Sequence, residues 1–565
     1  MREINTLYTE KGENFDVNAD KIYPRPGLKR DSFFSLDGIW EFGVGTTEVY
    51  DRKICVPFCP QSLLSGIGEV FSEDKTLFYK KEFSLPENFN IGRVLLHFGA
   101  VDQQCEVYLN GILIGEHLGG YDAFSFDITE ILLKENVLSV KVKDILRNKI
   151  MPYGKQCENP KGMWYTSVSG IWQTVWCESV PDKYIKSLKI STTLTSAQIL
   201  VDGINDGKIT VIDDENIQAE LKDGLAVINI ENPKLWTPES PHLYKFILEA
   251  GEDRVESYFA LRTLSIGKCG DKNRLLLNGK PYFFHGVLDQ GYFSDGIFTP
   301  ASLTEYTDDI LKMKSLGFNM LRKHIKVEPE FFYSECDRLG MVVFQDMVNN
   351  GKYSFLMDTA LPTIGLLRKN DKRSHKNPLS REMFIVSMEK TVSQLYNHPC
   401  ICQWTIFNEG WGQFCADELY DRLKALDSSR FIDSASGWFY SKKNDFDSRH
   451  IYFRKLKAKV SDKPLFISEF GGYSLNIKNH VFNKKSTYGY GKFTDREEFV
   501  KALRNLYLTE VLHLVEKGLC ATVYTQLSDV EDETNGLVTY DRKIMKVNPL
   551  EFADIYEKIQ QKILK

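Results

Sequence analysis

The sequence predicts two all-β sandwiches followed by a (β/α)8 barrel. Residues from about 36 to 266 form short runs in which apolar and polar side chains alternate, with turn residues between the runs. After Asn278 the pattern changes, and buried-looking apolar runs alternate with amphipathic helical ones. The first pattern is typical of antiparallel sandwiches and the second of parallel α/β folds. A chain of 565 residues is also long enough for about three or four domains.

The first sandwich is predicted to occupy residues 1–181. Its alternating runs include Gly38–Phe42, Leu77–Phe83, Val94–Phe98 and Glu106–Leu109. Asn110-Gly111 follows the last of these runs, and this dipeptide is a strong signal for a β-hairpin turn. No long stretch with the helical period interrupts the series, so we expect an all-β domain.

A second sandwich is predicted at residues 182–267. Ala226–Ile230 and His242–Leu248 repeat the alternating pattern. Pro233, Pro238 and Pro241 mark turns or sheet edges, because proline cannot donate a ladder hydrogen bond. The length of this block suits one immunoglobulin-like sandwich.

The remaining residues, 268–565, are predicted to form the barrel. Eight candidate strands follow one another: Phe283–Val287, Phe318–Arg322, Met341–Asp346, Ile401–Asn408, Arg430–Asp433, Arg449–Tyr452, Leu465–Glu469 and Ala521–Gln526. Helical runs near Leu303–Leu316 and Glu328–Leu339 separate the first strands, whereas helices are weak between the fifth and the seventh. Eight strands in about 290 residues match a (β/α)8 barrel. The polar stretch Asn349–Lys376 predicts a long loop over the rim.

Composition and motifs exclude several function classes. The net charge is −6, with 71 basic and 77 acidic residues mixed along the chain, so we expect no binding to nucleic acid or to an anionic membrane. No apolar window approaches the ~18 residues of a membrane-spanning helix. The N-terminus lacks an apolar signal-peptide core, and the eleven cysteines include no CxxC pair, which favours reduced thiols and a cytoplasmic location. A phosphate loop, an HExxH pair and a GxSxG elbow are also missing, and we expect neither a metal nor a cofactor.

Two apolar runs end on a glutamate, and these glutamates suggest the chemistry. Cys402–Phe407 leads to Asn408-Glu409, and Leu465–Ser468 leads to Glu469. Such runs suit strands covered on both faces, and the carboxyl ends of barrel strands meet at one rim. Glycoside hydrolysis requires two carboxyl groups there, one to protonate the leaving oxygen and one to attack or to activate water. A structural ion pair is the alternative for either glutamate.

Motifs in all three predicted domains point to one family. They are Leu36–Trp40, Asn110-Gly111, Gly119–Phe124, Ser169–Trp172 and Leu235–Pro238 in the sandwiches, and Asn408-Glu409, Ser468–Gly472, Asn535–Leu537 and Asp541-Arg542 in the barrel. Together and in this order they resemble glycoside hydrolase family 2, which includes β-galactosidases, β-glucuronidases and β-mannosidases. The resemblance implies a jelly-roll, sugar-binding-like first sandwich, an immunoglobulin-like second one and a catalytic TIM barrel.

The resemblance also implies roles for the two glutamates. Family members use the glutamate after the Asn on the fourth strand as acid/base, here Glu409, and the glutamate closing the seventh strand as nucleophile, here Glu469. Arg322 is placed to keep Glu469 ionised, because a nearby guanidinium lowers the pKa of a carboxylate. Glu409 has to remain protonated and is expected in a drier setting. Asn408 is placed to bind the sugar 2-hydroxyl.

Further substrate-binding candidates lie at the predicted strand ends. They are Asp289, His324, Asp346, Trp438, His450 and Tyr452. Tyr452 resembles the family tyrosine that hydrogen-bonds the nucleophile, and Tyr524 stands where many members carry a tryptophan platform on the eighth strand. Histidines near a rim often serve only as hydrogen-bonding groups, and tryptophans often only pack, so structural roles are the alternative.

We predict a retaining exo-β-glycosidase whose first choice of substrate is a β-galactoside. β-Glucuronidases of the family carry Asn-x-Lys before the stretch that begins here at Gly536, whereas this chain has Glu533-Thr534-Asn535. An acidic residue there is expected to repel a uronate, so glucuronate, mannose and arabinose rank behind galactose. An inactive carbohydrate-binding protein is the alternative from another class. The oligomeric state stays open, although sandwich edges pair subunits into homo-oligomers in many members of the family.

Overall fold

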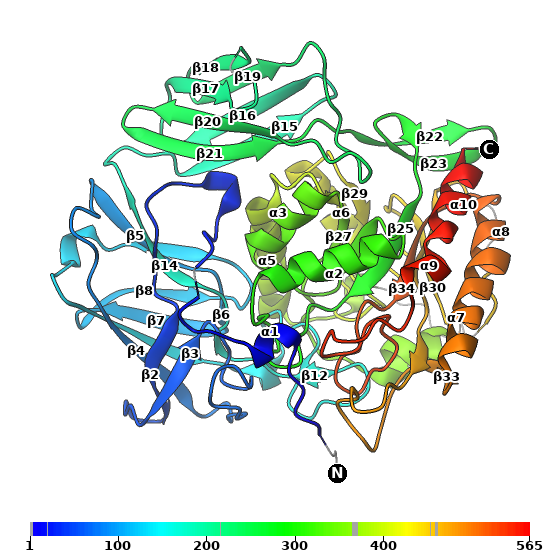
Figure 1. Ribbon diagram of the computed structural model, residues 1–565, viewed down its shortest axis with the longest axis horizontal. Helices are drawn as coiled ribbons and strands as arrows, with labels where there is room; N and C mark the ends of the chain where they lie inside the picture. The colour runs from blue at the N-terminus through cyan, green and yellow to red at the C-terminus, as the bar shows by residue number, and fades with distance from the viewer. Residues whose placement is uncertain are drawn as a thin grey trace.

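The computed structural model describes residues 4–19, 21–214, 216–363, 371–452, 454–457 and 461–564. Two β sandwiches and a barrel follow one another along the chain (Figure 1). Both sandwiches contact the barrel: Tyr153 of the first donates a hydrogen bond to the carbonyl of Gly351, and Trp236 of the second to the carbonyl of Asp337. Among the described residues no helix is long and apolar enough to cross a membrane.

The first sandwich packs a four-stranded sheet, in the order β1, β14, β5, β9, against a six-stranded sheet, in the order β3, β2, β4, β10, β7, β8. Alternate residues of the strands face the space between the sheets, as Leu138, Val140 and Val142 do along β10. The strands are β1 (Phe34–Ser35), β2 (Gly38–Gly45), β3 (Arg52–Val56), β4 (Thr76–Phe83), β5 (Arg93–Phe98), β7 (Gln104–Leu109), β8 (Ile112–Leu118), β9 (Phe124–Asp127), β10 (Asn136–Lys143) and β14 (Val175–Val180). Two small sheets join β6 (Val101–Asp102) to β13 (Gly170–Ile171) and β11 (Gln156–Cys157) to β12 (Tyr165–Thr166).

The second sandwich has a three-stranded sheet, in the order β15, β16, β19, and a four-stranded sheet, in the order β18, β17, β20, β21. Ile199, Phe246 and Val255 belong to the apolar core between them. The strands are β15 (Ser187–Thr192), β16 (Ser196–Asp202), β17 (Gly207–Val211), β18 (Gln218–Leu221), β19 (Leu225–Asn229), β20 (Tyr244–Ala250) and β21 (Asp253–Phe259). A small antiparallel sheet of β22 (Leu264–Cys269), β23 (Lys272–Leu277) and β24 (Lys280–Pro281) then leads into the barrel.

Eight parallel strands form the barrel, in the order β29, β28, β27, β26, β25, β34, β31, β30. The first barrel strand along the chain, β25, pairs with the last, β34, so the sheet bends into a barrel. In the described part of the chain, no backbone pairing joins β29 to β30, and the barrel is open between these two strands. Almost every strand residue is buried, because helices cover the outside and side chains fill the inside. The strands are β25 (Phe284–Asp289), β26 (Met320–Lys323), β27 (Val342–Asp346), β28 (Ile401–Thr405), β29 (Phe431–Asp433), β30 (Asp447–Ile451), β31 (Leu465–Gly471) and β34 (Leu519–Thr525). The predicted barrel is therefore confirmed.

Helices cover the outside of the barrel (Figure 1). They are α2 (Thr304–Ser315), α3 (Glu330–Leu339), α5 (Pro378–Leu395), α6 (Ala416–Leu426), α7 (Arg496–Asn505), the π-helical turn η6 (Leu506–Val511), α8 (Leu512–Val515), α9 (Pro549–Phe552) and α10 (Asp554–Ile563). In α3, the buried Phe332, Tyr333 and Cys336 form one apolar face at helical spacing. The described residues between β29 and β31 contain no helix, as the weak helical pattern there indicates.

The predicted rim loop, residues 349–376, contains short helical turns. They are η4 (Phe355–Ala360), α4 (Leu361–Thr363) and η5 (Asp371–Arg373), while residues 364–370 of this prediction lie outside the described residues. Phe355, Thr359 and Pro362 line the cavity at the C-terminal ends of the barrel strands. The loop therefore contributes to that cavity rather than to the core.

A segment of the first sandwich, residues 151–168, also reaches the barrel rim. The N–H groups of Tyr153 and Gly154 donate to the carbonyl of Asn349, at 3.1 and 3.2 Å. Gly154 has a φ of 63°, and a Cβ atom there would lie 2.8 Å from the carbonyl oxygen of Ile325, so only glycine fits. This contact presses the sandwich segment against the end of β26.

Candidate active site

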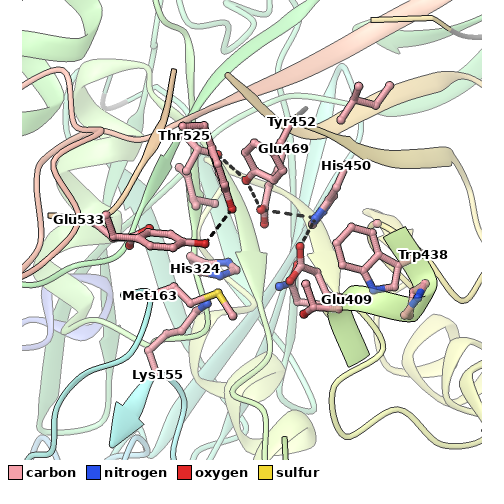
Figure 2. Close-up of a pocket in the computed structure, with 18 of the residues that line it drawn as sticks. Lys155, Met163, His324, Glu409, Trp438, His450, Tyr452, Glu469, Thr525 and Glu533 are labelled. Carbon is pink, nitrogen blue, oxygen red and sulfur yellow. Dashed lines mark hydrogen bonds and ion pairs between the residues drawn. The ribbon is translucent and has the colours of Figure 1, made fainter. Parts of the chain in front are cut away.

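A cavity of about 670 Å³ lies at the C-terminal ends of the barrel strands. Figure 2 shows its labelled residues, which come from the barrel and from the first sandwich. Seven residues predicted from the sequence line this cavity: His324, Asn408, Glu409, Trp438, His450, Tyr452 and Glu469. The fold therefore brings together residues that lie far apart in the sequence.

Glu409 reaches the cavity through an unusual backbone turn after β28. Its φ of 53° is in the left-handed region. This conformation is unfavourable for any residue other than glycine, and such strained residues cluster at functional sites. The N–H of Glu409 donates to the carbonyl of Ser436 at 2.9 Å, which holds this turn in place. The next residue, Gly410, also has a positive φ of 69°, and a Cβ atom there would collide with the ring of Phe439. The local sequence Glu-Gly thus permits the turn that presents the carboxyl group.

Glu469 lies near the C-terminal end of β31 and is surrounded by hydrogen-bond donors. Arg322 Nη1 lies 3.1 Å from its Oε1, and the hydroxyl of Tyr452 donates to its Oε2 at 2.5 Å. Burial alone would raise the pKa of this carboxyl, but the charges of His450, Arg322 and His324 and the Tyr452 hydrogen bond outweigh burial and lower it. Glu469 is therefore held in the ionised form.

Arg322 is fully buried at the base of the cavity and donates to four acceptors. Its Nε donates to Asp346 at 2.9 Å, and its Nη1 donates both to Glu469 and to the carbonyl of Ser468. Its Nη2 donates to the amide oxygen of Asn408 at 2.9 Å. Because the Asn408 oxygen is used in this way, its NH2 group is left to donate toward the cavity.

His450 lies between the two glutamates. Its Nδ1 is 2.9 Å from Glu409 Oε1 and 3.4 Å from Glu469 Oε2. Its Nε2 is 2.9 Å from the hydroxyl of Ser436. One oxygen of each glutamate and a ring nitrogen of His450 lie within 4.8 Å of one another, and among the described residues these donors are also the ones that could hold a metal ion. In this structure His450 is hydrogen-bonded to Glu409, and Glu469 takes its hydrogen bonds from Arg322 and Tyr452.

His324 and Trp438 form opposite parts of the wall (Figure 2). Nδ1 of His324 lies 2.7 Å from Asp346 Oδ2, and burial lowers the pKa of this histidine, with a further contribution from the charge of Lys155. The indole N–H of Trp438 donates to the carbonyl of Asp358 at 2.7 Å, which fixes the ring beside His450. Both side chains are thus positioned by neighbours before any ligand binds.

Four predicted site residues do not line the cavity: Arg322, which lies at its base, and Asp289, Asp346 and Tyr524. Asp289 is buried and binds the ammonium group of Lys323 at 2.6 Å. Lys323 also lies 4.2 Å from the ring centre of Phe332 on α3, so this ion pair belongs to the layer between strands and helices. Asp289 is thus paired with Lys323 outside the cavity lining, and its binding of substrate stays a prediction. Asp346 lies under the cavity and acts through Arg322 and His324 instead of facing the ligand.

Tyr524, predicted to contact the sugar, does not line the cavity. Side chains alternate along a strand, and Thr525 faces the cavity, so its neighbour Tyr524 points away from it. The Tyr524 ring lies 5.9 Å from Phe470 and contacts the backbone at Gly471. It is fully buried, and its hydroxyl has no hydrogen-bond partner among the described residues. Tyr524 is a core residue and not a sugar platform.

The expected dry setting of Glu409 is also wrong. Its side chain is 13% exposed, whereas that of Glu469 is 7% exposed. The acid/base candidate therefore lies on the more open side of the cavity, where an aglycone and water have access.

Several residues of the cavity wall were not predicted from the sequence. They are Lys155 and Met163 of the first sandwich, Gln290 after β25, Tyr488 and Tyr490 after β31, and Thr525. Glu533 also lines the cavity, but it was interpreted only as a group that repels uronates. The break in strand alternation at residues 151–168 was the one signal for the sandwich segment, because such a break indicates a chain that leaves its sheet.

Family models match all three parts of the chain. The model "Glycosyl hydrolase 2 galactose-binding domain-like" matches residues 69–164. "Glycosyl hydrolases family 2" matches residues 180–262, and "Glycosyl hydrolases family 2, TIM barrel domain" matches residues 270–547. The matched segments follow the two sandwiches and the barrel in order.

Known relatives and structures are similar over much of the chain. A putative β-glucuronidase of Formosa agariphila is 28% identical over 422 residues, which cover 70% of this chain and 46% of that protein. A β-galactosidase of Thermoanaerobacter pseudethanolicus is 26% identical over 437 residues, which cover 71% of this chain and 54% of that protein. The chain thus spans about half the length of these two relatives.

A solved β-glucuronidase from an uncultured Clostridium species shares the fold, with a TM-score of 0.74 and 19% identity over 95% of this chain and 100% of that one. The family models, the relatives and the shared fold all point to the family that the two glutamates at the barrel rim suggested. On this evidence the chain belongs to glycoside hydrolase family 2.

Proposed function

We propose that the protein is a retaining exo-β-glycosidase, which releases a terminal β-linked sugar in two displacements. In the first, Glu469 attacks the anomeric carbon while Glu409 protonates the leaving oxygen, and a covalent glycosyl-enzyme forms. In the second, Glu409 deprotonates a water molecule that attacks the same carbon and releases Glu469. Two inversions leave the product with its β configuration.

The separation of the two carboxyl groups carries this proposal. One oxygen of Glu409 lies within 4.8 Å of one oxygen of Glu469. Retaining enzymes hold these groups about 5–5.5 Å apart, whereas inverting enzymes leave about 6.5–9.5 Å for a water molecule between them. The short separation supports attack by a carboxylate.

The surroundings of the two glutamates support their different roles. Glu469 is buried, hydrogen-bonded by Tyr452 and paired with Arg322, so it is ionised and oriented for attack. Glu409 has one observed side-chain partner, His450, and the more exposed side chain. An acid/base needs this access because it exchanges protons with the leaving group and with water.

The cavity supports the binding of one terminal sugar. Its volume of about 670 Å³ suits a small ligand, and the NH2 group of Asn408 is free to donate to a sugar hydroxyl near Glu469. Relatives named β-galactosidase and β-glucuronidase both match this chain, so β-galactosides and β-glucuronides are the first substrates to test.

A panel of aryl β-glycosides, with NMR of the first-formed product, tests this proposal. We expect hydrolysis of at least one aryl β-glycoside with the β-anomer appearing first, and no hydrolysis by Glu469→Ala. An α-anomer as the first product would contradict retention. A folded protein that binds sugars but hydrolyses none of the glycosides would instead be a carbohydrate-binding protein with an inactive barrel.

A further inference from the structure

Lys155 lines the cavity, and its ammonium group lies 5.6 Å from the ring centre of Trp164, with no ion-pair partner among the described residues. Its side chain comes from the sandwich segment 151–168, is 8% exposed and lines the same cavity as Glu409 and Glu469 (Figure 2). Among the described residues, no acceptor lies within hydrogen-bonding or ion-pairing distance of its ammonium group. Burying an ammonium group costs free energy unless an anion compensates it. Lys155 thus presents to the cavity a positive charge that an anionic group of a ligand could neutralise.

The catalytic carboxylates do not compensate this charge. Glu469 is bound by Arg322 and Tyr452, and Glu409 is bound by His450. The other Lys or Arg side chain that lines the cavity, Arg454, is exposed to solvent. Figure 2 shows Lys155 on the side of the cavity away from Glu409. The unpaired charge thus lies across the cavity from the acid/base.

The backbone around Lys155 is fixed before a ligand binds. Tyr165 N–H donates to the carbonyl of Lys155 at 3.1 Å. This hydrogen bond lies at the start of the parallel pair formed by β11 and β12. Gln156 donates to the buried Asp102 at 2.8 Å, and Gly154 packs closely against Ile325. A rigid backbone limits the entropy lost when the lysine binds an anion.

Glu533 is a carboxyl group that lines the same cavity as Lys155. Its Oε2 accepts hydrogen bonds from the hydroxyl of Tyr165 and from Gln526. Its Oε1 has no hydrogen-bond partner among the described residues, and the residue lines the cavity. Burial raises the pKa of Glu533 to about 7, although the Tyr165 hydrogen bond and the charge of Lys155 act in the opposite direction. Below that pH Glu533 is neutral, so it no longer repels a carboxylate and can donate a hydrogen bond to one.

We propose that Lys155 and Glu533 form a carboxylate-binding subsite that makes the enzyme selective for β-uronides. This inference rests on the proposed glycosidase function and names its substrate class. The terminal sugar enters the cavity with its anomeric carbon at Glu469, and a uronic acid carries its carboxylate on C5 of the same ring. The Asn-x-Lys found in β-glucuronidases is missing before Gly536, and in this proposal Lys155 of the first sandwich takes the role of that lysine.

Matched pairs of substrates test the selectivity of the unmodified enzyme. p-Nitrophenyl β-D-glucuronide is compared with the glucoside, and the β-D-galacturonide with the galactoside, since each pair differs only at C6. At pH 6 we expect kcat/KM of at least one uronide to exceed that of its neutral partner about 100-fold, the range for a buried charge-assisted contact. Faster hydrolysis of both neutral sugars would overturn the inference and leave the glycosidase function intact.

Variants then locate the subsite. Lys155→Ala should lower the ratio of uronide to neutral-sugar kcat/KM about 100-fold, and Lys155→Arg should restore part of it. Lys161→Ala, an exposed lysine of the same segment, is the matched control and should leave the ratio unchanged. An equal loss on both members of a pair in Lys155→Ala would show that the lysine only supports the fold.

A binding measurement separates the inference from catalysis. If no aryl glycoside is hydrolysed, the proposed function fails, and calorimetry on the full chain still tests the subsite. Glucuronate or galacturonate should then bind at least about 10-fold more tightly than the corresponding uronamide, and Lys155→Ala should abolish the difference. Equal affinity for acid and amide would overturn the subsite by itself.

Discussion

His450 connects the acid/base candidate to its supporting loop: its Nδ1 lies 2.9 Å from Oε1 of Glu409. The other ring nitrogen lies 2.9 Å from the hydroxyl of Ser436, whose carbonyl accepts the N–H of Glu409. The backbone of Glu409 is therefore held by the loop after β29, and its side chain by His450 on β30. The same imidazole approaches Glu469, so one side chain sets the relative position of both carboxyl groups.

Replacing His450 tests this role as a positioning residue. His450→Leu should lower kcat/KM about 100-fold for aryl and alkyl glycosides alike, because both carboxyl groups lose a fixed donor. His450→Asn should retain more activity, since its amide N–H can occupy the position of Nδ1. Steady-state kinetics with a thermal unfolding control measures this, and equal activities of the two variants would contradict a role through Nδ1.

Arg322→Ala should move the acidic limb of the pH profile of kcat/KM to higher pH. Arg322 helps to lower the pKa of Glu469, so without it the carboxylate takes up a proton at higher pH, by about 1 pH unit or more. Removing one partner of a buried ion pair also costs about 3–5 kcal/mol of stability, so folding has to be verified first. Arg322→Lys keeps the charge and is the control. If the acidic limb does not move in a folded Arg322→Ala variant, groups other than Arg322 lower the pKa of Glu469.

Glu409→Ala should lose activity according to the leaving group. Dinitrophenyl glycosides need no protonation and should still form the glycosyl-enzyme, whereas alkyl glycosides should react at least about 100-fold more slowly. Added azide should give a β-glycosyl azide by attacking the covalent intermediate. Product stereochemistry is read by NMR, and an α-azide would mean that Glu409 is the nucleophile.

Glu469→Ala should fail on both classes of leaving group, because the covalent step is removed. Azide can enter the vacated space and displace a good leaving group directly, which should yield an α-glycosyl azide. The same NMR assay measures this outcome. Hydrolysis of dinitrophenyl glycosides at wild-type rates would exclude Glu469 as the nucleophile.

Tyr524→Phe should be neutral for catalysis and neutral or stabilising for the fold. The Tyr524 hydroxyl is buried without a partner among the described residues, so its removal relieves a cost of up to about 1 kcal/mol. Tyr452→Phe is the matched comparison: it removes the donor to Glu469 and should lower kcat about 10- to 100-fold. Chemical denaturation and steady-state kinetics measure both variants. A large loss of activity in Tyr524→Phe would contradict this and show that the Tyr524 hydroxyl takes part in catalysis or substrate binding.

The barrel and its two glutamates could be predicted because their signals are local. An apolar run such as Leu465–Ser468 predicts a buried strand, and the residue after it must lie at the rim of a parallel barrel. Tyr524 and Asp289 show the limit of this reasoning. Shifting the register by one residue moves a side chain to the other face, and the sequence did not reveal which of Tyr524 and Thr525 faces inward.

Lys155 and the state of Glu533 could not be predicted from local patterns. Lys155 reaches the cavity because a sandwich segment packs on the barrel, a contact between residues far apart in the sequence. Glu533 was expected to repel a uronate because a surface carboxylate is charged at neutral pH. Its burial, which only the assembled fold produces, raises the pKa of Glu533 to about 7, so the expected repulsion weakens below that pH.

The close packing of Gly154 on Ile325 means that the cavity is complete only when the first sandwich is docked on the barrel. A barrel with all its strands in place still lacks the wall that carries Lys155 and Met163. During refolding, recovery of activity should therefore follow the joining of the domains and lag behind the return of barrel secondary structure. The rate of turnover would then be proportional to the number of molecules in which the two domains are in contact, so an activity assay would report domain docking.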